Sequence, residues 1–407
     1  MKLGMNIPLK KATNSEIKIK ERNWVDDIDR DIIPYIKEPE WKYSYPTKTA
    51  ISISKEEKEY VEKQARILFN AMNKTVKCVR NLPEFEKFDF IASKFDCTSH
   101  LARMDFVKDM NNDFYLVEIN ADTPCAIPET FYGNFVYTQD KETQKRVNVN
   151  GELACVFAQL STSIDDFFVF AANEEYQEDW YNAKYLYDNF KHYFPRTKSE
   201  LASLNDLEVF DDGVYLSGKK IDVLYRLHPV EMLMEDTSAD GYPVGRKLIE
   251  LHNEGKVILV NSPEAIVMQD KRLFAMMTNF DNRFGFYTKE EKRAIVLMMP
   301  YTTTATNLEY IHDTVIAKPI YGREGSGITT VNRADIAKID NNNDEYIYQE
   351  YVEQPTVTAE TVEGDKLTGY VTYSVFLLNG EPTAWYARFS PKEICDEEAL
   401  WIPIEFK

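Results

Sequence analysis

Residues 101–120 alternate between apolar and polar side chains on both sides of the pair Asn111-Asn112. Two alternating segments with a turn-forming pair between them are typical of a β-hairpin. Strand side chains point alternately to two faces, so Arg103 and Asp105 share one face of the first strand. A fold that contains this hairpin must accommodate a charged face on a pair of strands. The polar residues that share one face of the second strand are Glu118, Asn120 and Asp122.

The predicted register brings charged groups together. With a two-residue turn, Asp105 lies opposite Glu118, and Arg103 lies opposite Asn120. Like charges at paired positions destabilise a sheet, so the two carboxylates need a compensating cation, a shared proton or solvent. Their oxygens, with that of Asn120, suit magnesium, while Arg103 can hold a phosphoryl group or a substrate carboxylate. The alternative is a surface hairpin with ordinary charges. A metal site predicts that Asp105→Asn relieves repulsion and leaves the metal-free protein at least as stable.

A lysine inside an apolar strand is the second informative feature. Lys318 lies in the strand-like segment 315–320, and a glycine-rich loop follows at once. Glycine permits positive φ and close approach to phosphate, so the lysine and the loop are predicted to hold nucleotide phosphates, with the loop closing as a lid. The lysine precedes the glycines, which excludes a P-loop. The alternative is a plain glycine-rich turn. The loop residues predicted to bind nucleotide are Gly325, Ser326 and Gly327.

A later strand completes this pattern. The strand-like segment 345–352 contains the polar pair Gln349 and Glu350. An adenine cleft between two sheets requires a strand lysine on the phosphates and a strand end whose backbone meets the adenine edge. The order of these parts is more specific than any one of them. The alternative is an amphipathic strand with an exposed polar end.

Periodicity outlines the rest of the chain. Ser54 and Glu57 have capping-box spacing and open a helix that is predicted to run to about residue 73. Alternating strand-like and helix-like segments predict an α/β unit, and later strand-like segments predict an α+β nucleotide-binding lobe. The polar stretch 263–271 is a predicted boundary between them. The segments of the α/β unit are 167–172, 174–191, 220–226, 245–253 and 256–260, and the later strands are 314–319, 345–352, 368–378 and 382–389.

Composition excludes several classes of protein. The formal net charge of -19 disfavours nucleic-acid binding, because the phosphate backbone would be repelled. Five cysteines without a C-x-x-C pair indicate neither a disulfide framework nor a zinc site, and favour a reducing compartment. No apolar run is long enough for a membrane span. We therefore expect a soluble cytoplasmic protein; its oligomeric state is not indicated.

The ordered motifs resemble those of the glutathionylspermidine synthase family from about residue 20 to the C-terminus. This resemblance implies an α+β, ATP-grasp-like ligase with a nucleotide cleft between two sheet-containing lobes and an additional α/β lobe. The amidase domain of longer members has no counterpart here, so amide hydrolysis is not expected. The motifs are Arg103-Met-Asp105-Phe, Glu118-Ile-Asn120-Ala-Asp-Thr-Pro124, Arg226-Leu-His-Pro-Val-Glu231, Lys318-Pro-Ile-Tyr-Gly-Arg-Glu-Gly325 and Tyr348-Gln349.

The resemblance also implies domains and roles. Residues 1–130 form an N-terminal region whose helix and metal-binding hairpin contribute to the cleft, 131–262 the α/β substrate lobe, and 263–407 the ATP-binding lobe. Glu178 and Asp179 resemble an acidic pair that contacts the polyamine, although carboxylates in a first helical turn also complement the helix dipole. The implied site residues are Asp105, Glu118 and Asn120 for Mg²⁺, Arg103 and Arg388 for the reacting group, Lys271 and Lys318 for ATP phosphates, and Gln349 and Glu350 for adenine.

The implied reaction joins a small carboxylate to an amine at the expense of ATP. Glutathione or a similar peptide carboxylate and a polyamine such as spermidine are the implied substrates. Cys125 and Ile127 stand where the family pattern has small hydroxyl residues, so the peptide substrate is an open choice. The alternatives are a ligase for another acid and amine, and a non-catalytic relative that binds nucleotide or polyamine. His228 is expected to be structural and Cys125 a packed thiol.

Overall fold

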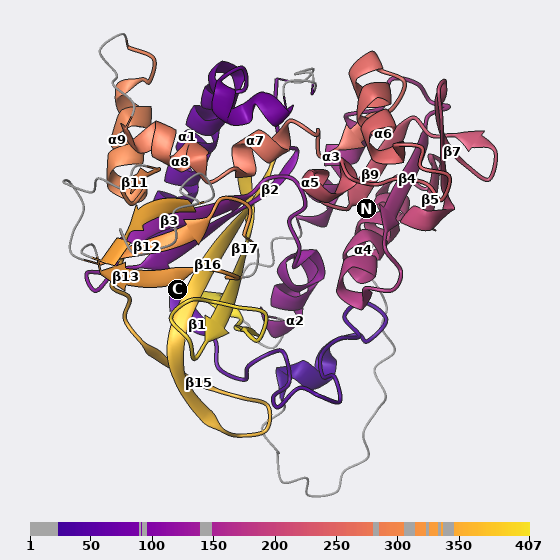
Figure 1. Cartoon of the computed structure of the whole chain (residues 1–407). Helices are drawn as coiled ribbons and strands as arrows, with labels where there is room; N and C mark the ends of the chain where they lie inside the picture. Colours follow the sequence, from indigo (N-terminus) through magenta and orange to yellow (C-terminus); the bar gives the residue numbers. More distant parts are fainter. Residues whose placement is uncertain are drawn as a thin grey trace, which may run out of the picture.

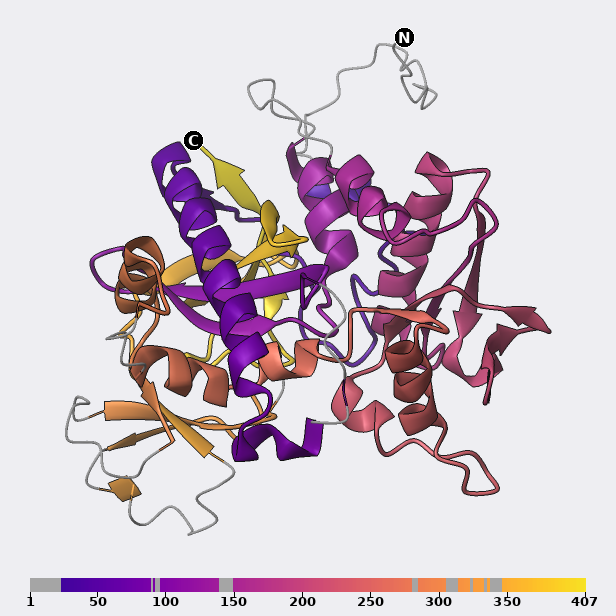
Figure 2. The same ribbon diagram turned by 90° about the horizontal axis from the view of Figure 1, so that it is seen from above.

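Figures 1 and 2 show the computed structural model, which describes residues 23–88, 91, 96–138, 149–279, 285–304, 314–322, 325–332, 335–336 and 346–407. This part of the chain has a mixed α/β fold with five sheets. Early and late parts of the sequence meet, because β1 (Ile51–Ile53) pairs in parallel with β19 (Ile404–Phe406). Among the described residues, no helix combines the length and the apolar character that crossing a membrane requires.

The largest sheet joins the predicted hairpin to the C-terminal strands. β2 (Leu101–Lys108) pairs with β3 (Phe114–Asn120) on one side and with β16 (Lys366–Leu378) on the other, in both cases antiparallel. β17 (Glu381–Ser390) extends the sheet beyond β16. The predicted hairpin and the two predicted C-terminal strands are therefore confirmed. Two short strands complete this sheet, β15 (Val357–Glu360) and β18 (Leu400–Trp401).

Helix α1 (Lys55–Val79) packs against β16 and β17 and carries the predicted capping box. The Ser54 hydroxyl accepts a hydrogen bond from the Glu57 backbone N–H at 3.1 Å, and the Glu57 carboxylate accepts one from the Ser54 N–H at 2.8 Å. The helix runs past its predicted end near residue 73, because Val76 and Val79 are still buried in the core. Three more helices contact α1, namely α7 (Ala265–Gln269), α8 (Arg272–Asn279) and α9 (Lys289–Met298).

The turn of the β2–β3 hairpin differs from the prediction. Lys108 pairs with Phe114, so the loop between the strands is one residue longer than the predicted two-residue turn. Asn112 takes a left-handed φ of 68°, as the last residue of a three-residue hairpin loop commonly does. The two-residue prediction was therefore wrong.

A β-bulge corrects the register before the charged face is reached. The register shifts just after Asp105, and Val117 on β3 is left without an opposing residue. As a result Asp105 faces Glu118, and Arg103 faces Asn120, as the sequence predicted.

A parallel sheet of order β10-β9-β4-β5 forms a second layer, whose strands and helices match the predicted α/β unit. Its aromatic core includes Phe157, Phe170 and Tyr225. A small antiparallel sheet, β6-β7-β8, lies beside it in sequence and in space (Figure 1). The bounds are α3 (Asn150–Ala158), β4 (Phe167–Ala172), α4 (Gln177–Tyr193), β5 (Lys198–Ser203), β6 (Leu207–Phe210), β7 (Gly213–Leu216), β8 (Lys219–Lys220), β9 (Val223–Leu227), α6 (Val244–Glu254) and β10 (Ile258–Val260).

A third sheet carries the predicted strand lysine. Its order is β11-β14-β12-β13, and β12 lies between β14 and β13. The stretch 263–271, predicted as a boundary, contains helix α7, whose apolar side chains are fully buried. The strands are β11 (Thr302–Thr303), β12 (Thr314–Pro319), β13 (Thr329–Asn332) and β14 (Tyr346–Glu350). The remaining elements are η1 (Trp24–Asp27), η2 (Pro83–Phe88), η3 (Glu129–Gly133), α2 (Asn134–Thr138), η4 (Leu204–Asp206) and α5 (Val230–Leu233).

Candidate active site

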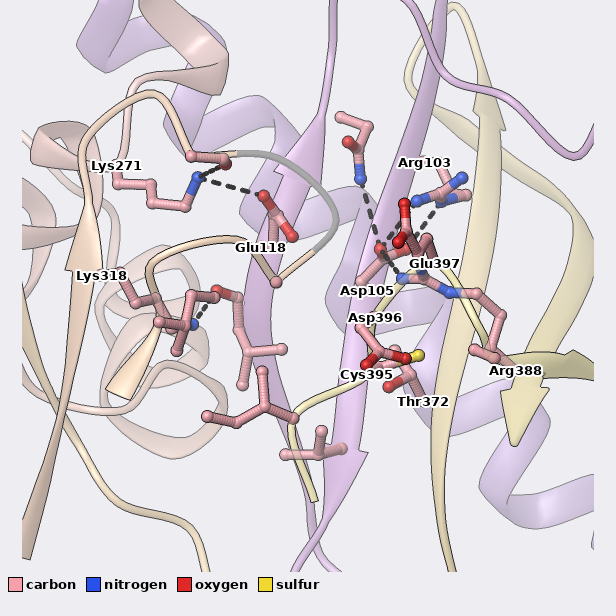
Figure 3. A pocket seen from close by; sticks show the side chains of 18 of the residues that line it. Arg103, Asp105, Glu118, Lys271, Lys318, Thr372, Arg388, Cys395, Asp396 and Glu397 are labelled. Atoms are coloured by element: carbon pink, nitrogen blue, oxygen red, sulfur yellow. Dashed lines mark hydrogen bonds and ion pairs between the residues drawn. The ribbon is translucent and has the colours of Figure 1, made fainter. Parts of the chain in front are cut away.

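A cavity of about 330 Å³ is lined by residues of the largest sheet and of the third sheet. Figure 3 shows two groups of charged side chains in it, Glu118 with two lysines and Asp105 with two arginines. Ser326 and Gly327 do not belong to the lining. The predicted site residues that line the cavity are Arg103, Asp105, Glu118, Asn120, Glu178, Asp179, Lys271, Lys318, Gly325, Gln349, Glu350 and Arg388.

Asp105 is held between two guanidinium groups. Arg103 donates to both carboxylate oxygens at 2.9 and 3.0 Å. Arg388, on β17 of the same sheet, donates to one of them at 2.9 Å. The Asn120 amide adds a fourth hydrogen bond, at 3.2 Å. Burial alone would raise the pKa of Asp105, but Arg103 and Arg388 outweigh it and hold this pKa below its ordinary value. Asp105 is therefore an ionised, fully buried carboxylate.

Glu118 has a different cation. Its carboxylate lies 3.2 Å from the ammonium of Lys271, which also donates to the Gly322 carbonyl at 2.8 Å. The two carboxylates that face each other across the hairpin are thus compensated separately, Asp105 by arginines and Glu118 by lysine. The repulsion that we expected between them is offset by these groups of the protein, so the predicted gain in stability for Asp105→Asn needs correction.

Lys318 is buried on β12, and no carboxylate among the described residues forms an ion pair with it. It donates to the Gln349 side-chain oxygen at 2.8 Å and to the Val117 carbonyl, the bulge residue of β3, at 3.1 Å. Burial, helped by the nearby charge of Lys271, lowers the pKa of Lys318 to about 8. Gln349 in turn donates to the Thr302 hydroxyl at 3.1 Å. The side chain of Gln349 therefore orients Lys318, a role that the sequence did not suggest.

The glycine-rich loop has the predicted backbone at two positions. Gly325 and Gly327 have φ of 73° and 71°. A Cβ added at Gly325 would lie 2.5 Å from the Cys395 carbonyl oxygen, so the loop packs closely on the segment 393–397 that also lines the cavity. Arg323 and Glu324, the central residues of the loop motif, lie outside the described residues.

We call Arg103, Arg388, Lys271 and Lys318, with Asp105 and Glu118, the cationic region. A second part of the site, the acidic region, contains Glu178 and Asp179 in the first turn of α4 and the phenols of Tyr45 and Tyr386, all of which line the cavity. The two phenol oxygens are 2.7 Å apart. Glu129, a buried neighbour of these phenols that does not itself line the cavity, completes the acidic region.

Glu129 is fully buried in this second region. Within the described part of the chain, no hydrogen bond of ordinary geometry reaches either of its carboxylate oxygens. Burial, reinforced by the charge of Glu178, raises the pKa of Glu129 to about 8, although Tyr35 and Tyr45 partly oppose this shift. Glu129 is therefore protonated at neutral pH.

Sequence reasoning missed several residues of the site. Tyr386 lies two residues before Arg388 on β17 and so on the same face, which was a signal that could have been used. Tyr45, from the N-terminal segment, carried no such signal. Cys125, which we expected to be a packed thiol, also lines the cavity. Further lining residues without a predicted role include Thr123, Glu231, Tyr321, Thr372, Glu393, Cys395, Asp396 and Glu397.

Part of the predicted motif set is structural. Arg226 and Asp122 form a fully buried ion pair at 2.6 Å, and Asp122 also accepts a hydrogen bond from the Val230 N–H at 2.8 Å. These contacts tie the parallel sheet to the open end of the hairpin. His228 lies 2.8 Å from Asp236, in keeping with the expected hydrogen-bond role. Among the described residues, no group of three or more His, Cys, Asp or Glu side chains is placed to hold a metal ion.

Comparison with known proteins agrees with these observations. A solved structure of a glutathione synthetase-like effector from Globodera pallida, in its apo form, resembles the chain with a TM-score of 0.64 at 9% sequence identity. The similarity covers 89% of this chain and 90% of that chain. At this identity the likeness concerns the fold alone. The family model described as glutathionylspermidine synthase preATP-grasp matches residues 16–407. Since this match spans nearly the whole sequence, the chain belongs to the glutathionylspermidine synthase preATP-grasp family.

Proposed function

We propose that the protein is an ATP-dependent carboxylate–amine ligase that forms an amide bond through an acyl phosphate. The observation that carries the proposal is one cavity with two charge characters, a cationic region and an acidic region. Family membership supports the reaction class. Glutathione or a similar peptide supplies the carboxylate, and a polyamine such as spermidine supplies the amine. The five free cysteines are compatible with a reducing, cytoplasmic location.

The nucleotide is assigned to the ATP-grasp cleft between the third sheet and the largest sheet. Lys271 and Lys318 bind its phosphates as point charges, and the loop at Gly325 covers them. The end of β14, at Gln349 and Glu350, borders the adenine. In this assignment residues 1–130 supply the hairpin, residues 263–407 the ATP-binding lobe and residues 131–262 the substrate lobe.

The hairpin face offers oxygen ligands that fit Mg²⁺. Asn120 uses its amide nitrogen for Asp105, which leaves its carbonyl oxygen for a metal, and Glu118 uses one oxygen for Lys271. Asp105 would become a ligand by giving up one of its hydrogen bonds for a bond to the metal. Bound Mg²⁺ would neutralise charge on the ATP phosphates, which is the chemistry that it supplies in such sites.

Arg103 and Arg388 are assigned to the transferring phosphoryl group, on which negative charge develops. A carboxylate oxygen of the peptide attacks the γ-phosphorus of ATP, and ADP leaves with the electrons of the broken P–O bond. The amine nitrogen then attacks the carbonyl carbon of the acyl phosphate, phosphate leaves, and the nitrogen loses a proton. Asp105 holds both guanidiniums in fixed positions, so their stabilising effect on the transferring group needs little reorganisation.

The acidic region is assigned to the amine substrate. Glu178 and Asp179 attract the distal ammonium groups of a polyamine into the cavity. The reacting nitrogen must be neutral in order to attack. Binding a polyamine by its far end leaves the near end free to lose its proton.

One observation favours a second candidate function, a relative that binds nucleotide or polyamine without turnover. Asp105 already accepts four hydrogen bonds from Arg103, Asn120 and Arg388. If these contacts do not yield to a metal, the ligase reaction lacks a ligand that the family pattern supplies.

Measuring ADP release separates the two. The full chain is incubated with Mg-ATP and a panel of peptides and polyamines, each omitted in turn. A ligase releases ADP only when the acid is present, and mass spectrometry finds the amide only when the amine is also present. Nucleotide binding without ADP release or amide for any pair of substrates would rule out the ligase for this panel and favour the binding relative.

A further inference from the structure

The two phosphate-binding lysines come from distant parts of the chain. Lys271 lies in the turn between α7 and α8, and Lys318 lies on β12. Figure 3 shows both side chains on the same side of the cavity, next to Glu118. Two point charges select neighbouring phosphates only if the distance between them is fixed. The contact that fixes the α7–α8 turn against β12 therefore matters for nucleotide binding.

Tyr321 supplies this contact. It follows β12 by two residues, and its hydroxyl donates to Asp270 at 2.5 Å and accepts from Arg272 at 2.7 Å. Asp270 and Arg272 are the chain neighbours of Lys271 on either side. Burial and the charge of Asp270 raise the pKa of Tyr321, so the hydroxyl keeps the proton that it donates.

A second bond closes the connection from the opposite direction. Lys271 donates to the carbonyl oxygen of Gly322, the residue after Tyr321, at 2.8 Å. The α7–α8 turn and the start of the glycine-rich loop are thus joined at two adjacent residues, Tyr321 and Gly322. When Lys271 turns toward a phosphate it gives up the bond to Gly322, whereas the Tyr321 hydroxyl keeps its bonds to Asp270 and Arg272.

We propose that Tyr321 is a positioning residue, which sets the spacing between Lys271 and Lys318 through Asp270 and Arg272. The inference rests on the proposed binding of ATP phosphates by the two lysines. It goes beyond that proposal because it assigns nucleotide affinity to a hydroxyl that touches neither lysine.

Tyr321→Phe isolates this hydroxyl. Asp270 and Arg272 remain paired by a two-pronged contact, with distances of 3.0 and 2.6 Å, so the variant leaves no buried charge without a partner. The phenyl ring also keeps its packing against Phe88, 6.2 Å between ring centroids, and stays below the Lys87 ammonium. The variant is therefore expected to fold.

Titration calorimetry with Mg²⁺ and a non-hydrolysable ATP analogue gives the test, on the full chain at one temperature. We expect the dissociation constant of Tyr321→Phe to rise about tenfold, as for the loss of a hydrogen bond to a charged group. Spermidine affinity should not change, whereas general structural damage would weaken both ligands. Tyr215→Phe is the matched control, since Tyr215 also donates to a carboxylate, Asp212, but on an exposed hairpin.

Lys87→Met tests the contact of the Tyr321 ring independently of its hydroxyl. The Lys87 ammonium lies 3.8 Å from the ring centroid, and its removal leaves the hydroxyl contacts intact. This variant should bind the nucleotide like the wild type. Equal nucleotide affinity for the wild type and Tyr321→Phe would overturn this inference and leave the proposed function standing. Equal weakening by Lys87→Met and Tyr321→Phe would also overturn it. A wild type that binds no nucleotide would instead overturn the proposed function itself.

Discussion

The cationic and acidic regions share one cavity but treat buried charge in opposite ways. In the cationic region each carboxylate has its own cation, with Asp105 between Arg103 and Arg388, and Glu118 beside Lys271. In the acidic region, Glu129 is buried among phenols and close to the charge of a second glutamate. The first region has its charges fixed before any ligand arrives. The second keeps a carboxyl group neutral by holding a proton.

This difference explains why the two regions should respond to different changes. Fixed ion pairs in a buried site are sensitive to the removal of one partner, since the other charge is then left without compensation. A carboxyl group that is neutral through burial is sensitive to pH instead.

Asp105→Asn should have the largest effect on stability. It removes the negative charge that lies between the buried guanidinium of Arg103 and the partly buried guanidinium of Arg388, so we expect a loss of about 3–5 kcal/mol in the free energy of unfolding of the ligand-free protein. This sign is the opposite of the sequence-based expectation, in which the substitution relieved repulsion from Glu118. Urea denaturation of both proteins measures the effect.

Asp165→Asn is the control for this prediction. Asp165 pairs with Lys198 at 2.9 Å, but its side chain is 80% exposed, so the expected change is below about 1 kcal/mol. If Asp105→Asn proved as mild as the control, Asp105 would not be a locked, compensated carboxylate, and the contrast between the regions would fail.

Glu129→Gln should change how stability depends on pH. The folded protein binds a proton at Glu129 up to about pH 8, whereas the unfolded chain releases it near the ordinary value of 4.5. Wild-type stability therefore falls as pH rises from about 5 to 8. The glutamine variant lacks this fall and should gain up to about 4 kcal/mol over the wild type across the same range.

Thermal melts at several pH values check this expectation. Glu175→Gln, at an exposed glutamate, should follow the wild-type profile. Parallel profiles for the wild type and Glu129→Gln would mean that Glu129 is ionised at neutral pH, and the acidic region would then resemble the cationic one.

The smallest predicted effect concerns the one titrating group of the cationic region that we identify. Lys318 has a pKa of about 8 in the ligand-free protein, and nucleotide phosphates bind its protonated form. Nucleotide affinity should therefore fall by up to about tenfold per pH unit above pH 8. The nucleotide phosphates have lost their own protons by then. Calorimetric titrations between pH 7 and 9.5 test this, and a constant affinity over that range would contradict it.

The sequence predicted the hairpin and its facing pairs because strand alternation leaves few registers that keep one face buried. The facing pairs were predicted correctly partly because two unpredicted features offset each other. The longer turn shifts the register by one residue, and the bulge at Val117 shifts it back before Asp105 and Glu118. Strand periodicity does not reveal a bulge. The same bulge turns the Val117 carbonyl toward Lys318, so the feature that the sequence did not reveal is part of the site.

Contacts between distant segments could not be predicted at all. The pairing of Glu118 with Lys271, the bond from Tyr321 to Asp270 and the place of Tyr45 beside Tyr386 depend on how segments far apart in the sequence pack together. Local periodicity reports which face of an element is buried, but not what it meets. The resemblance identified Lys271 and Arg388 as site residues, and the structure adds which carboxylate each one compensates.

A crossed binding experiment tests whether nucleotide and amine bind in separate parts of the one cavity. Affinities for a Mg-bound, non-hydrolysable ATP analogue and for spermidine are measured for the wild type, for Lys318→Ala and for the double variant Glu178→Gln with Asp179→Asn. Lys318→Ala should weaken the nucleotide at least about 100-fold and leave spermidine unchanged, while the double variant should show the reverse. Nucleotide affinity that survives Lys318→Ala, or spermidine affinity that survives the double variant, would contradict the account.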